Sequence, residues 1–344
     1  MPAEVKGLEI IAAEKLGQIA TGYISSSALN AVARLGIADL LAERSLSISE
    51  LATETCVHED SLARILRLLC SIGVFEEVSD LTFSNNEVSE GLRSGVPNSQ
   101  RDMITFVGDV LHFQCYADML PTIRDGRTAP EHVWGKGIFE VLADDPAAQQ
   151  RFDNAMTNLS QNAVAAILDA YDFTGIETLV DVAGGHGLLL TSILQRYPNM
   201  KGIVFDLTHV VSGANERIQQ LGLSNRCEAV AGDFFQSVPQ GDAIIMKHII
   251  HDWDDDRAIA ILKNCHRVLS AKGSSARLLL VEGLLASRNE PDFSKIMDVE
   301  MLMLPGGRER TEDQYGKLFD RAGFKIQQCI PTNSKYAIVE ARPK

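Results

Sequence analysis

Basic residues are scarce in this sequence. Its 344 residues include 32 Lys and Arg against 46 Asp and Glu, a formal net charge of −14 at pH 7, and no run of Lys or Arg occurs. Binding to DNA or RNA depends mainly on basic side chains that neutralise phosphates, and an acidic surface repels them. We therefore expect no nucleic-acid partner. A small partner that is uncharged or cationic fits better.

Paired cysteines and long apolar runs are missing as well. The six cysteines are scattered without a CxxC pair, which is typical of reduced, mostly buried thiols in the cytosol. No apolar run approaches the ~18 residues of a membrane span, so no membrane partner is expected. The first residues, MPAEVKGLEIIAAEK, lack the basic region and apolar core of a signal peptide. These features predict a cytoplasmic protein.

The length favours two domains, and residues 1–100 have the pattern of a winged helix. The segment SISELATETCVHEDSLARILRLLCSIGVFEEV predicts two helices, the first begun by a capping box of Ser47 and Glu50. A strand at 74–78 follows and pairs naturally with LTFS at 81–84. Two helices and a two-stranded wing are therefore expected in a mainly helical N-terminal domain.

The rest of the chain divides into a helical stretch and an alternating one. Residues 101–172 are expected to be helical, with breaks at Pro121, Gly126–Pro130 and Asp144–Pro146. From 173 to 344 short apolar strands alternate with helices, beginning ETLVDVAGG, HGLLLTSILQRYP, GIVFDL. Such alternation predicts an α/β fold with a doubly wound, mainly parallel, Rossmann-like sheet.

A glycine-rich turn follows the first of these strands. LVDVAGGHG places Asp181 at the strand end and Gly184, Gly185 and Gly187 in the turn, where glycine lets the backbone approach a ligand. The dinucleotide pattern G-x-G-x-x-G fails, because Leu190 stands where the third glycine is needed. The remaining pattern, D-x-x-G-G-x-G, resembles that seen in S-adenosylmethionine (SAM) methyltransferases.

The next two strands also end in acidic residues. Asp206 closes VFDL, where a carboxylate can accept hydrogen bonds from two ribose hydroxyls. Asp233 begins DFF after the third strand; it can take an adenine amino group, and Phe234 can cover the ring. Asp206 alone could equally be a helix cap or a solvent contact. Three successive strand ends with suitable residues favour a bound ligand.

The stretch MKHIIHDWDDDRAI follows the fourth strand and contains two histidines, His248 and His251. A metal site is not expected, because both precede the helix and the EF-hand spacing is missing. Histidine is the natural general base near neutral pH. Asp254–Asp256 are explained as a helix cap and first-turn acids. Asp252 could orient the loop or belong to the cap.

Two glutamates are candidates to assist a histidine base. Glu282 ends the apolar strand LLLVE, an awkward place for a carboxylate without a function. Glu309 lies in the glycine-rich loop MLMLPGGRERTEDQY, where a glutamate alone is more often solvated. Glu312 is explained as a first-turn acid after a Thr311 cap.

Taken in order, LVDVAGGHG, VFDL, GDFF, MKHIIHDW, VEGLL and MLMLPGGRERT resemble the metal-independent small-molecule O-methyltransferases of plants and bacteria. The resemblance covers nearly the whole chain. It implies a winged-helix dimerisation domain at 1–100, a helical linker and acceptor-pocket region at 101–172, and a SAM-binding domain at 173–344. It also implies SAM as cofactor, a small aromatic hydroxylated substrate and a homodimer formed through the N-terminal domain.

The resemblance further assigns roles to individual residues. His251 matches the catalytic base, and Glu282 and Glu309 match the glutamates that flank it. The expected cofactor contacts are Asp181, Gly184, Gly185, Asp206, Asp233, Phe234 and Lys247. The expected positions at or near the acceptor pocket are Met156, Trp253, Asp298, Met301 and Met303.

Two departures from the family pattern stand out. Ala183 replaces the first glycine of the usual D-V-G-G-G-x-G loop, and Leu159 stands where plant members often carry histidine. Two other functions stay open. One is a winged-helix regulator, which the acidic charge and a recognition helix with only Arg64 and Arg67 disfavour. The other is a relative that uses SAM for hydroxylation or decarboxylation, which the retained His251 and glutamates disfavour.

Overall fold

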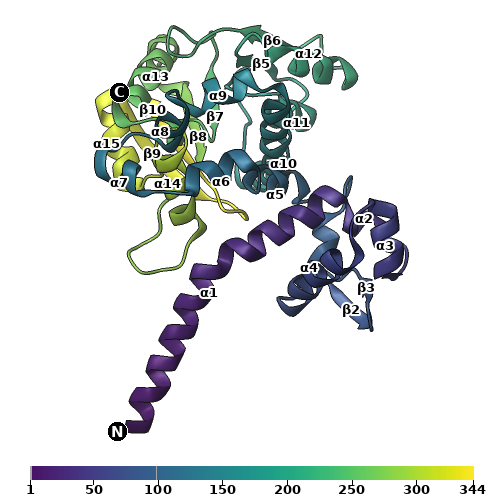
Figure 1. Cartoon of the computed structure of the whole chain (residues 1–344). Coiled ribbons are helices and arrows are strands. Elements are labelled where there is room, and N and C mark those ends of the chain that lie inside the picture. Colours follow the sequence, from purple (N-terminus) through teal and green to yellow (C-terminus); the bar gives the residue numbers. More distant parts are fainter. Residues whose placement is uncertain (1, 98) are drawn as a thin grey trace. The chain divides into compact units, whose positions relative to one another are not determined.

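The computed structural model describes residues 2–97 and 99–344. The chain forms two compact units, Met1–Phe113 and Gln114–Lys344, which are described separately. Figure 1 labels most of their helices and strands. No helix among the described residues is both long and apolar enough to cross a membrane.

The first unit contains the predicted winged helix. Two short helices lie between the first strand and the two-stranded wing of a small antiparallel sheet of order β1-β3-β2. The capping box of Ser47 and Glu50 that begins the first of these helices is present. The core is apolar and includes the fully buried Leu51, Leu66 and Phe83. Its elements are α1 (Pro2–Leu35), α2 (Ile37–Leu40), β1 (Leu46–Ser47), α3 (Ile48–Thr55), α4 (Glu59–Ser71), β2 (Glu76–Ser79), β3 (Thr82–Ser84), η1 (Ser89–Leu92) and α5 (Arg101–Val107).

Short helices lead to the sheet of the second unit. They are α6 (Val110–Tyr116), α7 (Leu120–Asp125), α8 (Ala129–Trp134), α9 (Ile138–Asp144) and the long α10 (Pro146–Ala170). The break expected at Pro121 falls just before it, between α6 and α7. Pro121 itself lies in the first turn of α7, where its missing N–H costs no helical hydrogen bond. The division of the chain at residues 100 and 172 stays a prediction.

The second unit is built on a seven-stranded sheet of order β6-β5-β4-β7-β8-β10-β9, which confirms the predicted α/β class. The first five strands in this order are parallel, and β10 is antiparallel to both its neighbours. The strands are β4 (Thr178–Val182), β5 (Lys201–Asp206), β6 (Cys227–Ala231), β7 (Ala243–Lys247), β8 (Arg277–Glu282), β9 (Phe324–Pro331) and β10 (Ala337–Pro343).

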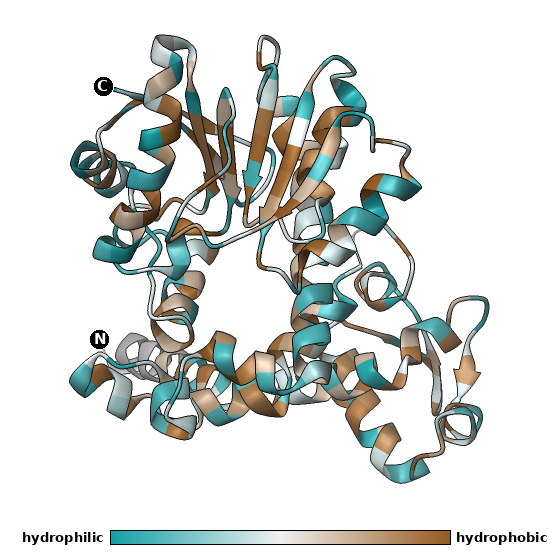
Figure 2. Ribbon diagram, turned by 90° about the horizontal axis from the view of Figure 1, so that it is seen from above, coloured by the Kyte–Doolittle hydropathy of each residue, from teal (hydrophilic) through white to brown (hydrophobic). Residues whose placement is uncertain are grey.

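Helices cover both faces of this sheet. Because successive side chains of a strand point to opposite faces, Val180 and Leu179 of β4 belong to two different apolar clusters, both fully buried. The strands are accordingly mostly brown in Figure 2. The helices that connect them are α11 (Leu188–Arg196), α12 (Val211–Gln220), α13 (Asp255–Leu269), α14 (Phe293–Met303) and α15 (Glu312–Ala322), with 3₁₀ turns η2 (Ile250–Asp252) and η3 (Ser270–Ser275).

Candidate active site

The carboxyl ends of four parallel strands bring polar side chains to one edge of the sheet. Asp206, Lys247 and Glu282 are the last residues of β5, β7 and β8. Asp181, one residue before the end of β4, pairs in register with Ile245 of β7. Ligands of open α/β sheets bind outside these ends, so the sheet places the predicted residues where a ligand would bind.

The glycine-rich turn after β4 is shaped by left-handed backbone. Ala183, Gly185 and Gly187 have φ of 55°, 57° and 74°, and a Cβ at Gly184 would lie 2.8 Å from Cγ of Asp181. The N–H of Gly185 donates to Oδ2 of Asp206 at 2.8 Å. Glycine is therefore needed at Gly184 for space, whereas Ala183 occupies a conformation that suits glycine.

Ala183→Gly is expected to stabilise the protein. A non-glycine residue in the left-handed region costs roughly 1–2 kcal/mol, which exceeds the ~0.5–1 kcal/mol of extra chain entropy that glycine loses on folding. We expect the Tm to rise by about 1–3 °C, with cofactor affinity retained. Differential scanning calorimetry checks this, and a fall in Tm would show that the Ala183 methyl group contributes more packing than strain.

The Asp206 carboxylate is fixed by two backbone hydrogen bonds and can accept more. Oδ1 accepts the N–H of Leu207 at 2.7 Å, and Oδ2 accepts that of Gly185. Each carboxylate oxygen can accept a second hydrogen bond, as two ribose hydroxyls would require. Burial raises the pKa of Asp206. Burial also raises the pKa of Asp181 to about 7, although the positive charge of Lys247 lowers it. This edge therefore fits a nucleoside with a cationic group.

Aromatic rings follow Asp233 and gather around Trp253. Phe234 and Phe235 pack edge-to-face on Trp253, with ring centroids 6.0 and 4.8 Å away, and Phe139 of α9 lies at 6.3 Å. Asp233 accepts the N–H of Phe235 at 2.8 Å, so it also forms the turn that carries these rings. The apolar surface suits a planar ring system such as adenine.

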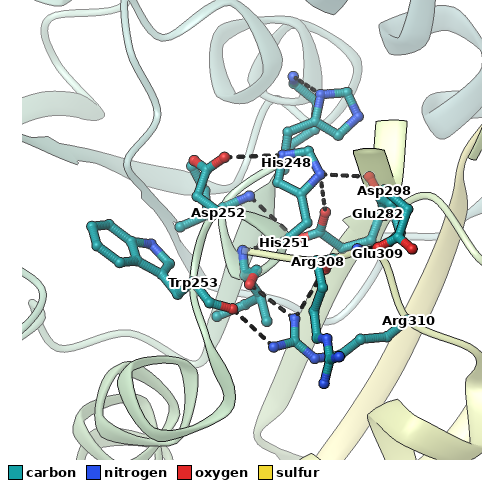
Figure 3. A network of polar contacts seen from close by, with 12 residues as sticks. His248, His251, Asp252, Trp253, Glu282, Asp298, Arg308, Glu309 and Arg310 are labelled. Atoms are coloured by element: carbon teal, nitrogen blue, oxygen red, sulfur yellow. Dashed lines mark hydrogen bonds and ion pairs between the residues drawn. The ribbon is translucent and has the colours of Figure 1, made fainter. Parts of the chain in front are cut away.

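His251 lies in the turn η2, buried among carboxylates (Figure 3). Its Nδ1 is 2.8 Å from Oε1 of Glu309 and 3.7 Å from Oε2 of Glu282. Its Nε2 lies 3.5 Å from Oδ1 of Asp252. The structure thus brings together the three residues predicted as catalytic. It also places Asp252 beside the imidazole rather than in the helix cap.

Glu282 and Glu309 make hydrogen bonds to different parts of the His251 turn. Oε1 of Glu282 accepts the N–H groups of Ile249 and Ile250 at 3.2 and 2.9 Å, so this side chain fixes the backbone that precedes His251. Glu309 bonds the imidazole itself. Oε2 of Glu282 and Oε2 of Glu309 are buried without a hydrogen-bond partner in the described part of the chain.

Burial and charge shift the titration of the site. Burial lowers the pKa of His251, but the carboxylates of Glu282, Asp252 and Glu309 outweigh it and raise this pKa to about 9. Burial raises the pKa of Glu282 to about 7 and that of Asp252 to about 6. Burial lowers the pKa of Lys247 to about 8. The site therefore holds excess negative charge around one imidazole.

His248 has a different environment from His251. Its backbone is strained, with φ of 56°; its Nδ1 is 3.3 Å from Nζ of Lys247, and its ring stacks on His251 with centroids 5.3 Å apart. Burial and the charge of Lys247 hold its pKa well below the usual value. His248 is therefore a neutral neighbour of the base. Among the described residues, no three His, Cys, Asp or Glu side chains could hold a metal ion.

The residues predicted at or near the acceptor pocket differ in how they connect to the His251 cluster. Asp298 accepts the N–H of Glu309 at 2.9 Å, and the carbonyl of Met301 accepts the N–H groups of Gly306 and Gly307. Trp253 directly follows the turn that carries His251. Met303 is fully buried and Met156 is half-buried, and no hydrogen bond of the described residues joins their side chains to the cluster.

Arg310 is the residue that the sequence analysis missed. Among the described residues it is the largest fully buried side chain, 1% exposed, and it pairs with Asp255 at 2.8 Å. Asp255 is a first-turn acid of α13, as predicted, and its carboxylate also binds this buried cation. Asp254 does cap α13, as predicted. The arginine beside Glu309 in a glycine-rich loop was the available signal.

Comparisons with known proteins agree with this geometry. An O-methyltransferase domain family matches residues 116–325, and an O-methyltransferase dimerisation domain family matches residues 18–94. A phenazine O-methyltransferase of Lysobacter antibioticus is 41% identical over 95% of each chain. A 3-amino-4-hydroxybenzoate 4-O-methyltransferase of Streptomyces cremeus is 33% identical over 92% of this chain and 86% of that one.

Solved structures extend the likeness to three dimensions. An O-methyltransferase from neocarzinostatin biosynthesis, crystallised with SAM and 2-hydroxy-5-methyl naphthoic acid, is 30% identical and has a TM-score of 0.80 over 93% of this chain and 96% of that one. The family and fold that the sequence motifs predict are therefore confirmed. The chain belongs to the O-methyltransferase family and is a SAM-dependent methyltransferase.

Proposed function

We propose that this enzyme transfers the methyl group of SAM to a hydroxyl of a small aromatic metabolite, with His251 as the general base. The observation that carries the proposal is the 2.8 Å contact between Nδ1 of His251 and Glu309. The aromatic acceptors in the names of relatives support the substrate class.

Glu309 explains how His251 becomes a base. A carboxylate at Nδ1 favours the tautomer with the proton on that nitrogen, so Nε2 carries no proton and can accept that of the hydroxyl. A phenol has a pKa of about 10 and an imidazole about 6.5, a mismatch of roughly 3.5 units. Three carboxylates around the imidazole stabilise its protonated form and reduce this mismatch.

The cofactor site follows from the strand ends. When bound, SAM supplies the electrophilic methyl group. Asp206 would accept hydrogen bonds from the ribose, the backbone at Gly184 and Gly185 would lie against the amino-acid end, and Asp233 with Phe234 would receive the adenine. Asp181 and Lys247 would be further polar residues of the cofactor site. No part of this proposal requires a metal.

We further propose a homodimer formed through residues 1–100, with 101–172 as the acceptor-pocket region and 173–344 as the SAM-binding domain. The match to a dimerisation family at 18–94 supports the first assignment. So do Leu16, Ile19 and Tyr23 of α1, which are each more than 60% exposed, because a protein rarely leaves such apolar side chains together in water.

Asp206→Ala is expected to weaken SAM binding by about 10- to 100-fold, since it removes hydrogen bonds to a charged acceptor and leaves Gly185 without its partner. Isothermal titration calorimetry measures the affinity. Asp256→Ala is the control, because Asp256 is 91% exposed on α13 and its loss should leave the affinity unchanged. An unchanged affinity for Asp206→Ala would remove Asp206 from the cofactor site.

The proposed function is tested by transfer of labelled methyl from SAM. A panel of hydroxybenzoates, hydroxynaphthoates, hydroxyindoles and hydroxyphenazines is the probe, with the matching arylamines and methyl ethers as controls. We expect label in at least one hydroxyarene and none in its methyl ether. Label that appears only in the arylamines would contradict hydroxyl methylation.

A further inference from the structure

We propose that Arg310 is a positioning residue, which locks the turn carrying His251 to the loop carrying Glu309. The inference rests on the proposed function, because it concerns the geometry of the same base. It assigns a role to a residue that touches neither the reacting atoms nor the cofactor contacts named above.

The guanidinium of Arg310 bonds both ends of the His251 turn. Its Nη1 donates to the carbonyl of Ile250 at 3.1 Å, and its Nη2 donates to that of Trp253 at 2.9 Å. Ile250 comes directly before His251 and Trp253 two residues after it, so the planar guanidinium spans the turn. Nε and Nη2 also donate to Oδ1 of Asp255, at 3.1 and 2.8 Å, which ties the turn to the start of α13.

The backbone of the same loop adds a second connection. The N–H of Arg308 donates to the carbonyl of His251 at 2.8 Å. Gly307 packs directly on this turn: a Cβ there would overlap the His251 carbonyl oxygen and the Asp252 backbone. Only glycine allows two backbones to approach so closely.

Glu309 sits between these two connections. Its N–H donates to Asp298 at 2.9 Å, and the carbonyl of the next residue, Arg310, accepts the N–H of Leu285 beyond β8 at 3.1 Å. The segment 307–310 is therefore fixed to α14, to the chain after β8 and to the His251 turn. A shift of this segment would change the distance between Glu309 and the imidazole.

The burial of Arg310 argues that its role is geometric. Burying a guanidinium is costly, and well-packed apolar residues often stabilise a fold equally well. By contrast, Arg321 of α15 pairs with Asp256 of α13 on the exposed surface. Planar donors that bind several acceptors at fixed angles are a property of arginine that lysine and apolar residues lack.

The test compares Arg310→Met and Arg310→Lys with the control Arg321→Met. We expect Arg310→Met to lower kcat by about 10- to 100-fold, the effect of a small displacement of a catalytic group, with SAM affinity within threefold of the original. Arg310→Lys keeps the positive charge but lacks the planar set of donors, so its kcat should lie between that of Arg310→Met and that of the unchanged enzyme. Arg321→Met should behave as the unchanged protein does.

A spectroscopic readout separates positioning from simple destabilisation. With ¹³C-labelled histidine, the imidazole signal of His251 is identified by its loss in His251→Gln. Arg310→Met should shift this signal and its titration, whereas Arg321→Met should not. If Arg310→Met does not fold, Asp255→Asn replaces it. The Asp255 carboxylate is 45% exposed, and its loss weakens the hydrogen bonds that hold the Arg310 guanidinium in place.

Two results would overturn the inference. One is a folded Arg310→Met with kcat and the His251 signal unchanged. The other is an equal loss of kcat and SAM affinity with an unshifted His251 signal, which would indicate general damage. Failure of the proposed function looks different, because His251→Ala would then remain active whatever Arg310 does.

Discussion

His251→Ala is expected to lower methyl transfer to a phenol of ordinary acidity by about 10²- to 10⁴-fold, the contribution of a positioned general base. Nδ1 of the imidazole contacts Glu309, so Nε2 is the nitrogen that can accept the hydroxyl proton. His251→Gln should lose as much, because an amide cannot accept a proton near neutral pH. A radiometric assay with saturating SAM measures the rate.

The control for this substitution is His58→Ala. His58 is exposed in the other unit and caps α4 through the N–H of Ser61, so its loss should leave methyl transfer near its original rate. SAM affinity should change little in His251→Ala. Near-normal turnover in either His251 variant would remove this residue from the mechanism.

Glu309→Gln is expected to have two effects of opposite kind. It removes one of the negative charges that raise the pKa of His251, so this pKa falls and the imidazole loses its proton at lower pH. The acidic limb of the pH–rate profile should therefore move to lower pH. The maximum rate should fall by about 10- to 100-fold, because the protonated imidazole loses a charged hydrogen-bond acceptor.

The sign of the pH shift makes this prediction specific. A base with a raised pKa becomes active as the pH rises through that pKa, so the unchanged enzyme should gain activity toward alkaline pH. Glu312→Gln is the matched control, since Glu312 is an exposed first-turn acid of α15. A profile of Glu309→Gln that keeps its acidic limb, or moves it to higher pH, would contradict the role of Glu309.

The sequence predicts the sheet edge well because its signals are local. Each strand is an apolar run that ends in a polar residue, so the positions of Asp206 and Glu282 follow from strand order and the parallel topology. The turn after β4 is likewise recognisable from its glycines. The helix α14 was not assigned, because its sequence, FSKIMDVEMLM, mixes apolar residues on all sides and gives no clear helical stripe.

The details of the site depend on contacts that no local pattern carries. That Asp252 faces the imidazole, and that Arg310 is buried, both follow from how the 307–310 segment lies against the His251 turn. The two are over fifty residues apart in the chain, joined by bonds such as that between Arg308 and His251. Ala183 shows a similar limit, since its left-handed backbone is set by the turn and not by the residue.

The central claim is that His251 removes the proton of the acceptor hydroxyl, and an acceptor that has already lost its proton tests it most directly. Two accepted hydroxyarenes of similar shape are compared, one with a pKa near 10 and one whose electron-withdrawing group keeps it ionised at the assay pH. We predict that His251→Ala loses about 10²-fold or more on the first and less than tenfold on the second. An equal loss on both would contradict general-base catalysis by His251.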